Sequence, residues 1–277
     1  MEEKYVDLHI HSYYSDGTMS PEEILEMAKK NNVGLIAITD HDVLEGSREL
    51  IELCKDSDVK CITGVELDAI YHNLNFHILG YGVDLENDEF QKFVKRDRAL
   101  LDEVNTKLIE KMENDYDDIS LEDYNNYNYE RNKGGWKALH YFVHKGLANN
   151  PWEGFDIYNK YDHDNTSVDF PAIKEVCYQI HKAGGKAVLA HPGKVIHKDT
   201  IDEFKEEVKG IIPFGIDGIE CYYQSHSKEI TEVCLDICQH EGLFVTTGSD
   251  CHGEFGNATI GQTKISKGVL ERYYNIK

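Results

Sequence analysis

Short apolar runs separated by amphipathic segments occur in both the first and the last part of the chain. In residues 1–85 the runs that predict strands are Val6–His11, Leu35–Thr39, Val59–Asp68 and Asn75–Tyr81. In the last part of the chain they are Ala187–Ala190, Gly218–Tyr222 and Leu243–Thr247. Because segments with helical spacing lie between them, the pattern predicts strands and helices in alternation, with the strands parallel.

Polar residues mark the start of the first predicted helix. Ser20, Pro21 and Glu23 form a capping box with proline at the first helical position. This combination predicts a helix that runs to about Asn31. A second helix is expected over Leu44–Cys54, between two of the predicted strands.

The middle of the chain has a different pattern. Its parts are a long charged helical stretch, an acidic segment rich in Tyr and Asn, and a further helix, at Asp88–Asn114, Asp115–Tyr129 and about Trp136–Lys145. We therefore expect an inserted helical subdomain at 86–168. Residues 1–85 and 169–277 then form one βα domain.

The number of predicted strands favours a barrel over an open sheet. About seven strands with intervening helices are enough to close, or nearly close, a βα barrel. The expected fold class is therefore α/β. In such a barrel the carboxyl ends of the strands converge on one face, where catalytic side chains collect.

Composition narrows the class of protein. The chain has 277 residues with 40% apolar content, which suffices for a packed core. No apolar run approaches the ~20 residues of a membrane span and the first residues do not resemble a signal peptide, so we expect no membrane contact and a cytoplasmic location. The 7 cysteines include no C-x-x-C pair, so we interpret them as buried thiols and expect no disulfide.

The net charge of −22 limits the possible partners. Nonspecific binding to duplex nucleic acid needs a basic surface that releases counterions, so a duplex partner is not expected. The acidic stretch Glu110–Glu130 would repel a long polyanion that passed near it, unless it is a solvated face that points away from the pocket. A small anionic substrate is not excluded, because charges that line a pocket decide what enters it.

Histidines and carboxylates stand at the ends of several predicted strands. His9 and His11 are two residues apart, so on a strand both imidazoles point to the same face. Asp16 follows in a Ser-Asp-Gly turn. His41 lies in an Asp-His-Asp run directly after the strand that begins at Leu35, and such a run is hard to explain by packing.

Five further titratable groups follow the same logic. Glu66 and His77 lie inside apolar strands, where a hydrogen-bonded core residue is the alternative interpretation for each one taken singly. His191 ends an apolar strand, and Asp250 and His252 end another. A packing role could explain any one of these residues, but a separate packing role for every one of them is improbable. We therefore predict one shared metal site built from six histidines and three carboxylates.

In order along the chain, these motifs read H-x-H, SDG, TDHD, GVE, HILGY, AHPG and GSDCHG. This order resembles the PHP (polymerase and histidinol phosphatase) family, and most of all its stand-alone phosphoesterases that act on nucleoside 3′,5′-bisphosphates and short RNA 5′ ends. The resemblance covers both βα segments. It implies a distorted (βα)7 barrel that carries a centre of three divalent metal ions.

The resemblance also implies which residues hold each ion. The first ion takes His9, His11, Glu66 and Asp250; the second takes Glu66, His77 and His191; and the third takes Asp16, His41 and His252. Mixed imidazole and carboxylate ligands suit Mn²⁺, Fe²⁺ or Zn²⁺. Glu66, His191 and Asp250 are the expected catalytic residues, while Asp7 and Asp40 are expected to orient ligand histidines.

The expected substrate contacts lie in the insertion and after the AHPG motif. They are Lys133, Lys137, His140 and Lys194. In nucleotide-bisphosphate relatives the comparable stretch has the form R-P-H-I-A-R, whereas lysine here lacks the bidentate guanidinium fork, so bisphosphate specificity is open. Trp136 either stacks on a base or anchors the insertion.

The function predicted is metal-dependent hydrolysis of phosphate monoesters of small nucleotides or of short RNA 5′ ends. One alternative is a phosphatase for another small phosphomonoester, such as a sugar or histidinol phosphate. The other is a noncatalytic metal-binding regulator, which has no evident need for open coordination positions.

Overall fold

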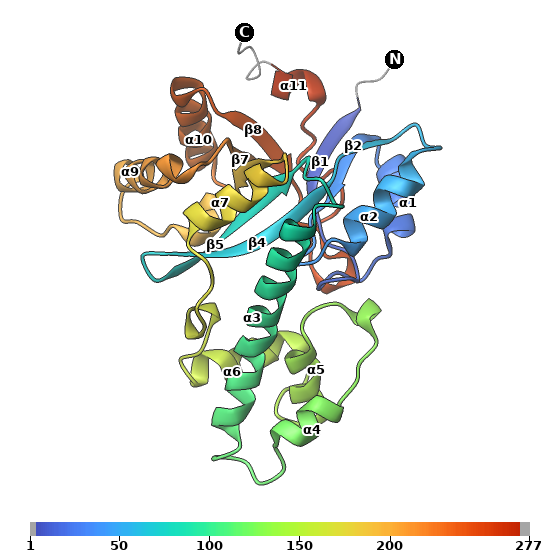
Figure 1. The fold of residues 1–277 in the computed structure, drawn as a ribbon, viewed down its shortest axis with the longest axis vertical. Helices are drawn as coiled ribbons and strands as arrows, with labels where there is room; N and C mark the ends of the chain where they lie inside the picture. Colours follow the sequence, from blue (N-terminus) through green and yellow to red (C-terminus); the bar gives the residue numbers. More distant parts are fainter. Residues whose placement is uncertain (1–3, 272–277) are drawn as a thin grey trace.

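The computed structural model describes residues 4–271, which form a mixed α/β part and a helical lobe beside it (Figure 1). The strands are β1 (Tyr5–Ile10), β2 (Val33–Ile38), β3 (Lys60–Cys61), β4 (Gly64–Tyr71), β5 (Leu74–Tyr81), β6 (Lys186–Leu189), β7 (Gly218–Tyr223) and β8 (Phe244–Gly248). They form a three-stranded sheet in the order β1-β2-β3 and a five-stranded sheet in the order β4-β5-β6-β7-β8.

The two sheets meet at both edges through short bridges. Ile10 pairs with Cys251, which joins β1 to the segment after β8, and His41 pairs with Glu66, which joins the segment after β2 to β4. The Asp250 backbone N–H also donates to the His9 carbonyl at 2.8 Å. The bridges fall at strand ends, so the chain segments that carry the predicted ligands are drawn together there.

One strand direction differs from the sequence prediction. β5 runs antiparallel to both β4 and β6, whereas the other paired strands are parallel. Only His72 and Asn73 separate β4 from β5, and both have positive φ (49° and 60°). A parallel pair would need a crossover of a dozen or more residues, so this short turn imposes a hairpin. The predicted strand Val59–Asp68 is also divided, into β3 and β4.

Helices cover the outer faces of the sheets (Figure 1). They are α1 (Pro21–Lys30) and α2 (Glu45–Cys54) beside the three-stranded sheet, and α7 (Ile173–Lys182), α8 (Pro192–Val195), α9 (Ile201–Ile211), α10 (Lys228–Glu241) and α11 (Lys267–Glu271) in the rest of the α/β part. The predicted capping box is confirmed, because the Ser20 hydroxyl accepts from the Glu23 N–H and the Glu23 carboxylate accepts from the Ser20 N–H. Across residues 4–271, no helix has both the length and the apolar character that a bilayer crossing requires.

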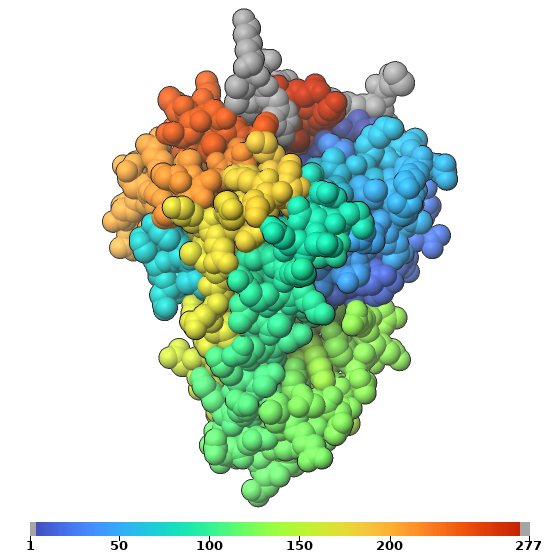
Figure 2. All heavy atoms as spheres, viewed as in Figure 1, coloured from blue at the N-terminus to red at the C-terminus, as the bar shows by residue number. Residues whose placement is uncertain are grey.

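The helical lobe consists of α3 (Asp88–Met112), α4 (Leu121–Asn126), α5 (Lys137–His144) and α6 (Phe155–Lys160). α3 belongs to two cores. Phe90 and Phe93 in its first turns pack with the sheets, whereas Leu108 and Met112 at its far end pack with α5. In the space-filling view the lobe (green) lies against the α/β part along α3 (Figure 2). This long helix therefore contributes side chains to the hydrophobic cores of both parts.

The expectation that no disulfide forms was wrong for one pair. Cys54 and Cys61 are joined, with Cα atoms 6.4 Å apart. α2 ends at Cys54 and the chain returns directly into β3, which brings the two Cα atoms within the span that a disulfide bridges. The remaining cysteines are free and buried, as predicted; they are Cys177, Cys221, Cys234, Cys238 and Cys251.

Candidate metal centre

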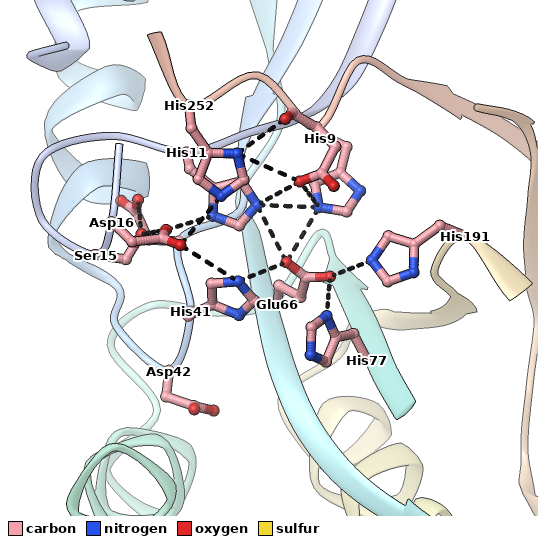
Figure 3. A network of polar contacts seen from close by, with 12 residues as sticks. His9, His11, Ser15, Asp16, His41, Asp42, Glu66, His77, His191 and His252 are labelled. Atoms are coloured by element: carbon pink, nitrogen blue, oxygen red, sulfur yellow. Dashed lines mark hydrogen bonds and ion pairs between the residues drawn. The ribbon is translucent and has the colours of Figure 1, made fainter. Parts of the chain in front are cut away.

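Four predicted ligands converge at the end of β1. The Nε2 atoms of His9 and His11 lie 3.1 Å apart, and each lies 3.1 Å from Oε2 of Glu66 (Figure 3). Oδ1 of Asp250 lies 3.4 Å from the His9 Nε2 and 3.2 Å from the His11 Nε2. Ligands about 2.0–2.2 Å from a tetrahedral ion lie roughly 3.3–3.6 Å from one another, so these separations suit a common ion.

A second group lies on the other side of His11. Asp16 Oδ2 is 3.1 Å from the His252 Nε2 and 3.9 Å from the His41 Nε2. His11 joins this group through its Nδ1, 3.4 Å from Asp16 Oδ1. His11, Asp16, His41 and His252 each offer a ligand atom within 4.8 Å of the others.

The other oxygen of Glu66 faces the third group. Its Oε1 lies 2.9 Å from the His77 Nδ1 and 3.1 Å from the His191 Nε2. Figure 3 shows Glu66 between these two imidazoles on one side and His9 and His11 on the other. The arrangement has the form expected of a carboxylate that bridges two sites. Asp42, by contrast, points away from Glu66 in the same view.

Burial and charge in this cluster fit cations. Glu66 has no exposed surface and Asp250 is 6% exposed. Burial would raise the pKa of Glu66, but the neighbouring His9, His77 and His41 hold it well below its usual range. Burial likewise favours neutral His11, yet Asp250 and Glu66 raise its pKa to about 10. The carboxylates therefore require positive charge, which bound divalent ions would supply in exchange for protons.

A family model supplies the decisive comparison. The model of the PHP domain matches residues 7–222, a span that includes the predicted ligands from His9 to His191. The chain belongs to the PHP family. The chain's relatives include enzymes that hydrolyse phosphate esters.

Relatives resemble the chain over nearly its whole length. A 5′-3′ exoribonuclease from Haemophilus influenzae is 28% identical over 278 residues, which cover 95% of this chain and 94% of the relative. A 3′,5′-nucleoside bisphosphate phosphatase from Chromobacterium violaceum is 26% identical over 274 residues, with 94% and 91% covered. A solved structure from Bifidobacterium adolescentis, inferred to be a metal-dependent phosphoesterase, has a TM-score of 0.77 at 24% identity and covers 98% of this chain and 96% of its own. At this sequence identity, the structural similarity shows that the two proteins share a fold.

Asp250 of this PHP protein is oriented by two donors. The Tyr223 hydroxyl donates to Asp250 Oδ2 at 2.8 Å, and the Lys194 ammonium lies 3.0 Å from the same oxygen. Oδ1 is thereby directed at His9 and His11. Burial would lower the pKa of Lys194, but Asp250 and Glu66 raise it, so the lysine stays charged beside the cluster.

The other three predicted substrate contacts form their hydrogen bonds and ion pairs with residues of the helical lobe. The Lys137 ammonium donates to the Asn125 carbonyl and lies over the Tyr124 ring. His140 Nε2 lies 2.7 Å from the Gly134 carbonyl, and Lys133 pairs with Glu130 at the surface. Their partners lie within the helical lobe. Of the four residues predicted to bind substrate, the structure brings only Lys194 to the metal centre.

Sequence reasoning missed Arg98, which lies on α3 beside the centre. Its Nη1 donates to the His41 carbonyl at 3.3 Å, and its guanidinium lies 5.5 Å from the Trp136 ring centroid. The Trp136 ring is in turn 5.6 Å from the His41 ring. Arg98 stands in a charged helical stretch of the sequence, where nothing distinguishes it from solvent-facing neighbours.

Asp7 and Asp40 form hydrogen bonds with neighbouring chain segments rather than with the rings of the ligand histidines. Asp7 accepts from the backbone N–H groups of Ser249 and Gly261, and Asp40 accepts from the Ser12 N–H and hydroxyl groups. Burial raises the pKa of Asp7 to about 6 despite these hydrogen bonds. The expectation that these two residues orient the ligand rings is therefore replaced by a role in holding the segments that carry them.

Glu220 on β7 orients two predicted ligands and was not found from the sequence. Its Oε1 lies 3.0 Å from the His9 Nδ1, and its Oε2 accepts from the His191 N–H at 2.9 Å. His191 has φ of 26°, a conformation in which its backbone needs such support. Gly248 allows the approach, because a Cβ there would lie 2.1 Å from the His9 Cβ and 2.4 Å from Glu220 Oε1. A glutamate within the apolar run Gly218–Tyr222 was the available signal, as it was for Glu66.

We expect Glu220→Gln to weaken metal binding about 10–100-fold, the usual effect of losing a group that orients a ligand. The amide keeps one acceptor oxygen, so it cannot serve both the His9 ring and the His191 N–H. The measurement is the metal dissociation constant by competition with a chelator, with the exposed Glu229→Gln as the matched control. Wild-type metal affinity in Glu220→Gln would contradict this role.

Proposed function

We propose that the chain hydrolyses phosphate monoesters of small nucleotides, or of short RNA 5′ ends, at a centre of three divalent ions. The observation that carries the proposal is Glu66, whose two carboxylate oxygens face different groups of imidazoles at 2.9–3.1 Å. Two adjacent ions can share one carboxylate, because each of its oxygens binds a different ion. The relatives that act on a nucleoside bisphosphate and on RNA support the nucleotide class.

The proposed ligands form three sets, of which the first two share Glu66. His9, His11, Glu66 and Asp250 hold one ion; Glu66, His77 and His191 hold another; and Asp16, His41 and His252 hold the third. Mn²⁺, Fe²⁺ and Zn²⁺ all suit such nitrogen and oxygen donors. When bound, the ions lower the pKa of water and stabilise charge on phosphate oxygens. We also propose that the strands constitute a distorted (βα)7 barrel and that residues 86–168 are its insertion.

The chain's own residues position the phosphate. Lys194 stays protonated beside Asp250 and contributes a point charge at the edge of the cluster. Arg98 reaches the same region through the His41 carbonyl and offers further guanidinium donors to an anionic group. Glu66, His191 and Asp250 are proposed as the catalytic residues because they surround the point where the groups meet.

Most of the acidic segment lies away from the metal centre. Residues 110–126 lie around the end of α3 and in α4, at the far end of the lobe from the sheets, whereas the chain after α4 returns toward the α/β part (Figure 1). Exposed charges are screened beyond about 8 Å, so this segment exerts little influence on the pocket. The preference for small substrates rests instead on the net charge of −22, which disfavours a long polyanion.

A second candidate is a phosphatase for a small monoester without a second phosphate. The observation that favours it is the engagement of Lys137 and His140 inside the lobe, which removes the predicted contacts for that phosphate. This candidate uses the same centre and the same catalytic residues. Under this candidate function, the protein would hydrolyse a sugar phosphate at least as fast as a nucleotide.

We expect the highest kcat/KM on small phosphorylated nucleotides or short single strands and the lowest on duplex DNA. The measurement compares a nucleoside 3′,5′-bisphosphate, a nucleoside monophosphate, a sugar phosphate, short RNA and duplex DNA at fixed ionic strength. Fastest turnover of duplex DNA would overturn the proposal. Fastest turnover of the sugar phosphate would keep the chemistry and select the second candidate.

A further inference from the structure

The helical lobe contacts the α/β part beside the ligands proposed for the third ion, which are Asp16, His41 and His252. After α4 the chain returns toward the α/β part (Figure 1), and there the Gly135 N–H donates to the Asp16 carbonyl at 2.7 Å. Gly134 and Gly135 are buried, and both have positive φ (67° and 66°), which glycine adopts without strain. Within the lobe, the Tyr129 hydroxyl donates to the Gly135 carbonyl at 3.2 Å. The segment of Asp16 is therefore tied to a fixed point of the lobe.

Phe255 packs against the same two glycines and lies three residues after His252. A Cβ on Gly135 would lie 2.5 Å from Cζ of Phe255, and a Cβ on Gly134 would lie 2.6 Å from the Phe255 Cβ. The phenyl ring thus rests directly on backbone that has no side chain. It also stacks on Trp152 of the lobe, with ring centroids 4.7 Å apart and 16° between the ring planes. The segment that carries His252 therefore contacts the lobe at two points.

His41 contacts the lobe through two further side chains. Arg98 Nη1 donates to the His41 carbonyl at 3.3 Å. The ring of Trp136, the residue directly after Gly135, lies 5.6 Å from the His41 ring. All three ligands proposed for the third ion therefore lie in segments that touch the lobe.

Ligands of the first two ions are oriented from within the α/β part. Glu220 on β7 lies 3.0 Å from the His9 Nδ1 and accepts from the His191 N–H at 2.9 Å. Tyr223 on the same strand donates to Asp250 at 2.8 Å. These contacts hold the ligands to the sheet whatever the position of the lobe.

The lobe approaches His77 through an intermediate residue. The Asn165 amide donates to Asp68 Oδ1 at 2.8 Å, and that oxygen lies 3.6 Å from the His77 Nε2. The Asn75 amide on β5 donates to the same oxygen at 2.6 Å, so the α/β part holds Asp68 as well. The direct contacts of the lobe are with the segments of the third ion's ligands.

The third group of ligands fits a cation. Asp16 is 6% exposed, and its Oδ2 lies 3.1 Å from the His252 Nε2. Nδ1 of His11 lies 3.4 Å from Asp16 Oδ1, and this buried nitrogen has no hydrogen-bond partner within residues 4–271. A divalent ion would supply the missing partner, because imidazole nitrogens and carboxylate oxygens are suitable ligands.

We propose that the helical lobe assembles the third metal site and that Phe255 is its main positioning residue. The inference rests on the proposed function and adds a division of labour to it. The α/β part holds two ions by itself, and the third ion binds when the lobe is docked. Because such coupling is reciprocal, the third ion in turn holds the lobe against the α/β part. Phe255 acts through the segment that carries His252.

Phe255→Ala should weaken the third ion about 10–100-fold and leave the affinities of the other two unchanged. Phe255→Leu keeps an apolar side chain against the glycines and should restore most of the loss. Tyr178→Ala, which removes an exposed ring on α7, is the matched control. Ions per chain and dissociation constants, from elemental analysis and chelator competition, are the readouts. Unchanged affinity for all three ions in Phe255→Ala, or equal weakening of all three, would overturn the positioning role.

Tryptophan emission reports the same coupling without any turnover. The chain has 2 tryptophans, Trp136 and Trp152, and both lie at this contact. Zn²⁺, which has a filled d shell, is titrated into the metal-free full chain. Emission should change as the third ion binds, because that ion fixes the segments against which both rings pack. The change should be lost in Asp16→Asn and kept in His191→Ala, which removes a ligand of the second ion.

The outcomes separate this inference from the proposed function. Three Zn²⁺ bound with no change in emission would overturn the role of the lobe and keep the three-ion centre. An emission change that persists in Asp16→Asn would do the same. Fewer than three Zn²⁺ per wild-type chain at saturation would instead overturn the three-ion centre itself, and the inference with it.

Discussion

Glu66→Gln is expected to lower kcat by about three orders of magnitude or more while the protein still folds. Glu66 is the carboxylate whose oxygens face His9 and His11 on one side and His77 and His191 on the other. The amide removes the negative charge and replaces one oxygen with a donor, so one site loses its oxygen ligand and the other keeps only a neutral carbonyl oxygen. Loss of metal-assisted charge stabilisation costs several kcal/mol of activation free energy, which corresponds to this rate change.

The controls separate catalysis from folding. Because the side chains have nearly equal volume, Tm should change little between the metal-free wild-type protein and metal-free Glu66→Gln. The exposed Glu229→Gln makes the same chemical change on the surface of α10 and should leave kcat unchanged. His191→Ala should resemble Glu66→Gln. Near-wild-type turnover of either variant at saturating metal would contradict the assignment of these catalytic residues.

Removal of metal with a chelator is expected to abolish activity and to lower thermal stability. Ions that bind the folded chain at a hundredfold excess over their dissociation constant stabilise it by about 2.7 kcal/mol per site. For a chain of this size, loss of one such site lowers Tm by roughly 5–10 °C. Calorimetry before and after chelation measures the shift, and Mn²⁺, Fe²⁺ or Zn²⁺ added back should restore both Tm and turnover. Turnover that survives chelation unchanged would contradict the metal requirement.

Much of the site could be predicted because strand geometry fixes where alternate side chains point. His9 and His11 are two residues apart and do face one cluster, and His191 and Asp250 follow apolar strands that end beside it. Convergence of separate segments is what a βα arrangement imposes on strand ends. The structure gathers all nine predicted ligands in one place, while the ions they hold stay a prediction.

Other features depend on tertiary contacts that one sequence does not reveal. The direction of β5 is set by the two-residue turn at His72 and Asn73, whereas an apolar run is compatible with either direction. Glu220 carried the same signal as Glu66, a carboxylate within an apolar run, but it lies outside the motifs that carry the family resemblance.

Metal content, measured together with activity on one preparation, tests the central claim most directly. We predict up to three transition-metal ions per chain by elemental analysis, with phosphoesterase activity that is lost as the ions are removed and recovered as they are replaced. A protein that contains no metal and keeps its phosphoesterase activity after exhaustive chelation would contradict the account.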